Sequence, residues 1–208
     1  MTDWLMQNGT RLLEKIFEHV YMFAIALIVG ILIAVPLGIF ISRYRKTSQA
    51  IISVTSVLQT FPSLAVLAIM VPILGIGKIP AIVALSLYSL LPILRNTYLG
   101  IVNMSPGIVD VAKGQGLSSA QVLRGVILPL AAPVIMSGIR VSGVYLIAWT
   151  TLAAYIGAGG LGDFIYTGLQ NYDINYILGG TIPVSLMAIL FDLLFGKIEK
   201  KVTPKTHR

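Results

Sequence analysis

The chain has 208 residues, of which 56% are hydrophobic and only 11% charged, and its formal net charge is +7. A charged fraction so far below the ~25% of an average soluble domain argues against a water-soluble enzyme and for an integral membrane protein. The chain contains no cysteine, which excludes disulfides, thiolate nucleophiles and cysteine-ligated metal sites.

Residues 1–19 are predicted to form an extracytoplasmic or interfacial segment. Apolar residues recur there at helical spacing, which favours a short interfacial helix with Trp4 as an anchor, and the alternative is an extension of the first span. The acidic residues Asp3, Glu14 and Glu18 argue against a cleaved signal peptide, as does the length of the apolar block that follows. His19 and His207 lie outside the apolar blocks, so we expect neither a buried histidine metal site nor an intramembrane histidine relay.

Five apolar blocks follow in the chain, each long enough to cross a hydrocarbon core of ~30 Å. They cover residues 20–42, 47–77, 79–99, 130–156 and 174–195. We therefore predict an all-α, polytopic membrane protein with five transmembrane helices and a single transmembrane domain over residues 20–196. Several blocks contain proline, and the hydrogen bonds lost at those prolines have to be covered by neighbouring helices, which favours a packed bundle.

Basic residues cluster between the blocks and after the last one, rather than on one amphipathic face. This pattern is typical of topology signals and argues against a nucleic-acid partner. Placing the loop around Arg43 inside puts ten basic residues in the cytoplasm, leaves Arg11, Lys15 and Lys78 outside, and assigns Arg95 and Arg140 to inner membrane edges. The N-terminus is then outside, and residues 197–208 form a basic cytoplasmic tail.

The segment of residues 100–129, between the third and fourth spans, is long for a simple loop. The run from Asp110 to Gly116 ends a short helix with glycines, and Ser118 or Ser119 is placed to cap a second helix that continues through Arg124. The pattern predicts a helix-turn-helix. It leaves open whether the second helix inserts into a groove of a partner or lies on lipid headgroups.

Within the spans, polar and aromatic side chains are candidates for a translocation path, because they need water or bundle-interior partners rather than lipid. Helix packing is the alternative role. Asp192 is the only acid inside a span, and we expect it to reach the nearby inner surface, so the driving energy comes from outside this chain or transport is passive. The path candidates are Gln59, Thr60, Ser63, Asn96, Trp149, Thr150 and Thr151.

Asp110, Ala112, Gly116 and the run Val126-Ile127-Leu128-Pro129 resemble the EAA signature of binding-protein-dependent ABC importers. That signature reads Glu-Ala-Ala, three residues, Gly, nine residues, Ile-x-Leu-Pro, and the spacing here is the same. The resemblance implies a type I ABC importer permease fold, in which this loop couples the chain to its ATPase. The implied contact residues are Asp110, Ala112, Gly116, Leu117, Ser118, Ser119, Gln121, Arg124 and Pro129.

Segments 59–65, 75–85, 88–98, 151–163 and 201–205 look like osmoprotectant permeases for glycine betaine, carnitine and choline. The implied protein is a permease subunit in a bacterial cell membrane that works by alternating access. Its implied partners are an ABC ATPase dimer, a second identical or paralogous permease, an extracytoplasmic substrate-binding protein and the lipid bilayer. The chain has no phosphate-binding loop, so it is expected to bind no cofactor and to be no enzyme, with ATP and Mg on the partner ATPase.

The glycine-rich run 157–162 is weak evidence alone, since it also suits a flexible loop or a phosphate-binding turn. Its external position implies a gate or a seat for the binding protein at Gly159, Gly160, Asp163 and Asp173, with solvated loop acids as the alternative. The nine tyrosines and two tryptophans show no cage-like cluster for a quaternary ammonium group. The competing functions are a passive channel or osmotic release pore and, last, an intramembrane hydrolase, which lacks a histidine or cysteine in any span.

Overall fold

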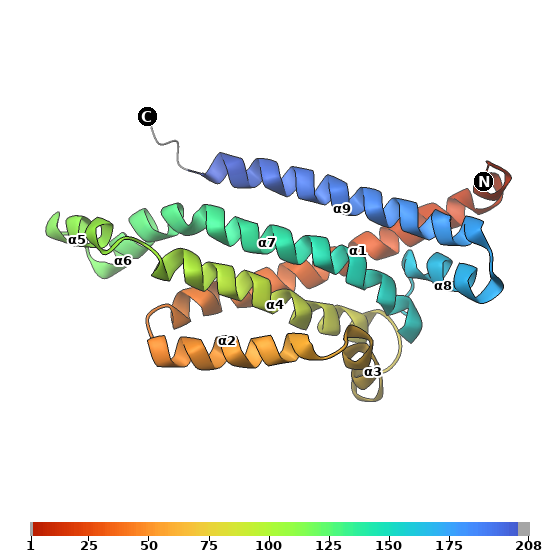
Figure 1. Ribbon diagram of the computed structural model, residues 1–208, viewed down its shortest axis with the longest axis horizontal. Helices are drawn as coiled ribbons and strands as arrows, with labels where there is room; N and C mark the ends of the chain where they lie inside the picture. Colours follow the sequence, from red (N-terminus) through yellow and green to blue (C-terminus); the bar gives the residue numbers. More distant parts are fainter. Residues whose placement is uncertain (1, 204–208) are drawn as a thin grey trace.

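The computed structural model describes residues 2–203, and these fold into helices without strands. The predicted tail residues Lys205, His207 and Arg208 lie outside the described part, as do Pro204 and Lys205 of the segment 201–205. The long helices are α1 (Thr2–Ile41), α2 (Arg45–Thr60), α4 (Lys78–Val102), α7 (Leu128–Thr150) and α9 (Ile174–Val202). They run side by side along the molecule, with α2 and α9 at its two edges (Figure 1).

Short elements close the two ends of this bundle. One end, here called the α5–α6 end, carries α5 (Pro106–Gly114) and α6 (Ser119–Val122), while the other, the α8 end, carries α8 (Gly162–Asn171) and the N-terminus (Figure 1). Two short segments flank α7: the π-helical turn η1 (Leu123–Ile127) before it and the 3-10 helix η2 (Thr151–Ile156) after it. The chain begins at the α8 end and α9 finishes at the α5–α6 end, as an odd number of crossings requires.

Helix α1 runs unbroken for 40 residues, so the N-terminal segment forms no separate helix but continues directly into the helix of the first predicted span. Trp4 is not an exposed anchor either, because only 8% of its surface is accessible. Its ring packs edge-on against Phe164 and Tyr176, with centroids 5.4 and 5.3 Å away. A Cβ at Gly179 of α9 would overlap that ring, so the missing side chain admits Trp4.

The predicted second span is two helices, α2 and α3 (Ser63–Leu74), that meet at a bend of 95°. Pro62 lacks a backbone N–H and forces Phe61 into an extended conformation, which ends α2. Four other helices are long and apolar enough to cross a membrane. Because α1 ends where α4 finishes, the bent pair has to return the chain and makes the fifth crossing (Figure 1).

The core lies between α1, α4 and α7, with Leu94, Ile93 and Leu146 fully buried in it. Helices α1 and α4 approach closely because small residues face each other: a Cβ at Gly30 or Gly38 would overlap Ser89 or Thr97. By contrast, α9 keeps a broad apolar surface exposed, including Leu186, Leu190 and Leu193. Such a surface suits lipid or a second subunit rather than water.

Candidate functional site

The α5–α6 turn has the helix-turn-helix form that the sequence predicted. Gly116 sits between the two helices at φ +84°, a left-handed conformation that glycine adopts without strain. Ser118 then caps α6 in a capping box: its own N–H donates to Gln121 Oε1 at 2.8 Å, and its Oγ accepts from the Gln121 N–H at 3.4 Å. Ala112 is buried beneath this turn.

The second helix of this motif does not stop at Arg124. It continues from α6 through the five-residue π-helical turn η1 into α7, so the turn is joined to a membrane-crossing helix without a break. Leu117, Gln121 and Arg124 line an open groove of about 440 Å³ together with Ala120 and Gly125. Among the other predicted contact residues, Asp110, Ser119 and Pro129 are exposed at the same end of the bundle.

At the α8 end, four charged side chains form what we call the ionic cluster: Lys15, Glu18, Lys78 and Asp163. Glu18 contacts Lys15 at 2.9 Å and Lys78 at 2.8 Å, and Lys15 contacts Asp163 at 2.6 Å. The cluster thereby joins α1 to the beginning of α4 and to α8. Glu18 is only 18% exposed, so this carboxylate is shielded from much of the solvent.

The glycine-rich run is fastened to the same carboxylate. The Gly160 N–H donates to Glu18 Oε2 at 3.0 Å, and a Cβ at Gly159 would overlap that carboxylate. Both glycines are buried and have positive φ. The predicted gate residues Gly159, Gly160 and Asp163 therefore come together, whereas Asp173 lies apart and caps α9 by accepting from the Asn175 N–H at 2.9 Å.

His19 lies outside the predicted apolar blocks, yet it is fully buried. Its side chain has no accessible surface, and Nε2 donates to the Ile147 carbonyl of α7 at 3.0 Å, while Nδ1 has no partner in residues 2–203. The sequence did not predict this burial, because the charged residues Glu14, Lys15 and Glu18 precede the apolar block and suggest a solvated segment. The continuous α1 carries the bundle's interior past these residues.

A second charged group lies nearer the α5–α6 end, between α7 and α9. Arg140 donates to both carboxylate oxygens of Asp192, from Nε at 2.7 Å and from Nη2 at 2.8 Å, and to Glu199 at 3.1 Å. The three residues are here called the Arg140 triad. The sequence predicted that Asp192 reaches the nearby inner surface, and the structure adds a two-point ion pair with Arg140 that the sequence did not predict.

Most of the predicted path residues make hydrogen bonds within their own helix. Thr60, Thr150 and Thr151 each donate to a carbonyl three or four residues earlier, as does Asn96, and Ser63 is half-buried at the start of α3. Gln59 donates to the Tyr88 carbonyl at 2.9 Å and Tyr88 donates to the Phe61 carbonyl at 2.8 Å, which ties the bend to α4. These contacts favour helix packing as their role.

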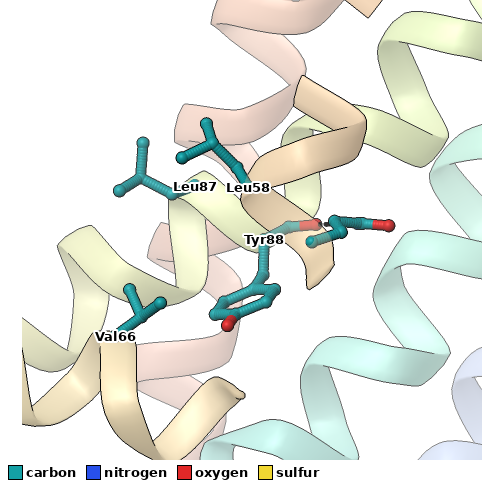
Figure 2. A pocket seen from close by; sticks show the side chains of 5 residues that line it. Leu58, Val66, Leu87 and Tyr88 are labelled. Atoms are coloured by element: carbon teal, nitrogen blue, oxygen red, sulfur yellow. Dashed lines mark hydrogen bonds between the residues drawn. The ribbon is translucent and has the colours of Figure 1, made fainter. Parts of the chain in front are cut away.

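Figure 2 shows the pocket beside Tyr88, lined by Leu58, Val66 and Leu87. Its volume is about 20 Å³, enough for roughly one water molecule. It is therefore not a chamber for an organic solute. In residues 2–203 no group of three histidine, aspartate or glutamate side chains is placed to hold a metal ion either.

Trp149 is the exception among the path candidates, because it belongs to an aromatic cluster that sequence reasoning missed. Its ring centroid lies 4.9 Å from that of Tyr88 on α4 and 5.6 Å from that of Tyr145 on α7. The four-residue spacing of Tyr145 and Trp149 predicts that these two rings share one face of a helix. Tyr88 is 57 positions before Tyr145, so its contact with this pair depends on the tertiary fold and could not be predicted from local spacing.

Comparison with known proteins gives consistent results. Residues 26–204 match the family of the "binding-protein-dependent transport system inner membrane component". The chain is 50% identical over 204 residues to the choline transport system permease protein OpuBB of Bacillus subtilis (strain 168), covering 98% of this chain and 94% of that protein. It is 47% identical over 208 residues to the carnitine transport permease protein OpuCB of Listeria monocytogenes, covering 100% and 95%.

A third relative is the glycine betaine/carnitine/choline transport system permease protein OpuCB of Bacillus subtilis (strain 168), 50% identical over 205 residues, with 99% of this chain and 94% of that protein covered. Among solved structures, a chain of the inward-facing MetNI methionine ABC transporter matches with a TM-score of 0.85 at 21% identity, over 93% of this chain and 96% of that one. A chain of an amino acid ABC transporter with histidines matches with a TM-score of 0.70 at 19% identity, over 95% of each. These two share the fold.

Proposed function

Because the chain belongs to the family of binding-protein-dependent transport system inner membrane components, we propose that it is the permease subunit of an ATP-driven importer for quaternary ammonium osmoprotectants. Choline, carnitine and glycine betaine are the proposed solutes. One observation carries the choice of solute: near-full-length identity of 47–50% to permeases named for those three compounds. The membrane location follows from the family itself and from the apolar helices.

In this proposal the α5–α6 end faces the cytoplasm and contacts a partner ATPase, which supplies ATP and Mg. The exposed groove beside Arg124 and Gln121 is the proposed contact, with the turn at Gly116 fixing its shape. The continuous path from α6 through η1 into α7 supports this role, since a displacement of the turn is passed to a membrane-crossing helix. Helical turns of the π type are frequent at such functional positions.

At the α8 end we assign the glycine run and the ionic cluster to an external gate, next to the docking place of a substrate-binding protein. The fastening of Gly160 to Glu18 supports it, because a loop held by hydrogen bonds and ion pairs is released when those contacts are broken. A second permease, identical or paralogous, is proposed to complete the pore. The exposed apolar surface of α9 leaves room for such a neighbour or for lipid.

Reconstitution tests the proposal. This permease is placed in liposomes together with its partner ATPase and binding protein. Uptake of labelled choline, carnitine and glycine betaine is then measured with and without ATP. The proposal predicts uptake that requires ATP, the binding protein and an intact Gly116. Solute passage through the permease alone, with no nucleotide, would instead support a passive channel.

A further inference from the structure

The aromatic cluster of Tyr88, Tyr145 and Trp149 has one open side. Tyr88 is only 5% exposed and forms the base, whereas Tyr145 is 51% exposed although it lies within a membrane-crossing helix. The hydroxyl of Tyr145 has no hydrogen-bond partner in residues 2–203. A phenol hydroxyl without a partner is unfavourable in hydrocarbon, so this side of α7 is suited to water or a polar ligand rather than to lipid.

The aromatic cluster lies between the two groups of charged residues along the bundle. Tyr88 lies ten residues along α4 from Lys78 of the ionic cluster, which is about 15 Å at the rise of an α-helix. On α7, Tyr145 lies five residues, or about 7.5 Å, from Arg140. The rings therefore lie between the ionic cluster and the Arg140 triad.

Tyr145 also lines a groove of about 270 Å³ between α7 and α9, with the Arg140 triad on its wall. The triad has one positive and two negative side chains, so the groove carries a net charge of −1. An aromatic face beside excess negative charge attracts a soft, weakly hydrated cation. Quaternary ammonium groups are the ligands that use such cation–π contacts.

We propose that the exposed face of Tyr145, backed by Trp149 and Tyr88, is a subsite for the trimethylammonium group of the transported solute. The groove beside it takes the rest of the molecule, and the net negative charge of Asp192, Glu199 and Arg140 offsets the positive charge of the ammonium group. This rests on the proposed function, since it names where that function's substrate is held on its way through the permease.

The test is uptake per ATP hydrolysed by the complete importer in liposomes, with labelled choline and glycine betaine. Tyr145→Phe keeps the ring face and is expected to transport like the parent protein. Tyr145→Leu removes it and is expected to lower uptake per ATP roughly 5- to 30-fold, while ATP hydrolysis is still stimulated by the loaded binding protein. Tyr21→Leu is the matched control, because Tyr21 is 47% exposed on α1 and makes none of these ring contacts.

The outcomes separate this inference from the function beneath it. If the parent importer takes up no quaternary ammonium compound, the proposed function fails and the subsite with it. If the parent transports but Tyr145→Leu is equally active, or Tyr145→Phe loses as much as Tyr145→Leu, the subsite alone is overturned. Trp149→Leu is the second variant, read by the same ratio should Tyr145→Leu fail to assemble with its partners.

Discussion

The two ends of the bundle are held by different kinds of interaction. At the α8 end, α1, α4 and α8 are distant in sequence and are joined by the ionic cluster around Glu18. At the α5–α6 end, the described residues of α5, α6 and η1 form no ion pair, and the joint is the continuous helix that leads into α7. One end is held by ion pairs, which can separate reversibly, and the other by a continuous run of helical turns. The difference suits a protein that is pushed at one end and opens at the other.

The α5–α6 end gives the largest expected effect. Gly116→Asp places a side chain at φ +84°, which costs about 1–2 kcal/mol, and adds a charge to the exposed turn. We expect uptake to fall by more than about tenfold because contacts with the ATPase are lost, while membrane insertion is unchanged. Uptake assays and co-purification with the ATPase measure this.

Gly114→Ala is the control for Gly116→Asp. Gly114 closes α5 two residues earlier, does not have positive φ, and has open space around the position of a Cβ. We expect it to transport normally. Equal losses in both variants would mean that any change in this loop is harmful and that the left-handed turn at Gly116 is not special.

The next prediction concerns the α8 end. Glu18→Gln removes the charge that pairs with Lys15 and Lys78 but keeps an acceptor for the Gly160 N–H. The substitution leaves Lys78 without its carboxylate partner, while Lys15 keeps Asp163, and breaking this partly shielded network costs about 1–3 kcal/mol. If the cluster holds the gate shut, ATP hydrolysis without binding protein should rise severalfold. Glu14→Gln, an exposed acid on the same helix, should leave that basal rate alone. A basal rate unchanged in Glu18→Gln would remove the cluster from the gating proposal.

Between these ends, the sequence predicted what is local and missed what is tertiary. The glycine turn and the serine cap are set by residues within four positions of each other, so spacing alone predicted them. Glu18 with Lys78, and Arg140 with Asp192, are joined across 60 and 52 positions. The periodicity of neighbouring residues carries no information about such long-range pairs. Because the partners of Glu18 are not visible in the local sequence, its charge indicated the end of a span. In the structure, its pairing with lysines allows helix α1 to continue through this position.

A smaller effect is expected for Ser118→Ala. It removes the side chain that caps α6, and loss of such a cap costs roughly 1 kcal/mol. Because α6 is one turn long and continues into η1, the loss should loosen the groove without unfolding α7. We expect weaker ATPase association, by roughly fivefold, and full recovery in Ser118→Asp, since aspartate also caps. Titration of the ATPase onto the permease in nanodiscs measures both, and failure of aspartate to restore binding would show that the hydroxyl has a role beyond capping.

The smallest effect concerns Asp173, which the sequence grouped with Asp163 as a contact for the binding protein. The two acids have different surroundings: Asp163 pairs with Lys15, whereas Asp173 accepts from the N–H of Asn175 at the start of α9. Serine caps helices about as well as aspartate, so Asp173→Ser should change stability by no more than about 0.5 kcal/mol. If capping is its whole role, the loaded binding protein should stimulate ATP hydrolysis as strongly in Asp173→Ser as in the parent, while Asp173→Ala lowers only thermal stability. A loss of stimulation in the serine variant, with stability retained, would return Asp173 to the docking surface and extend that surface from the ionic cluster to the start of α9.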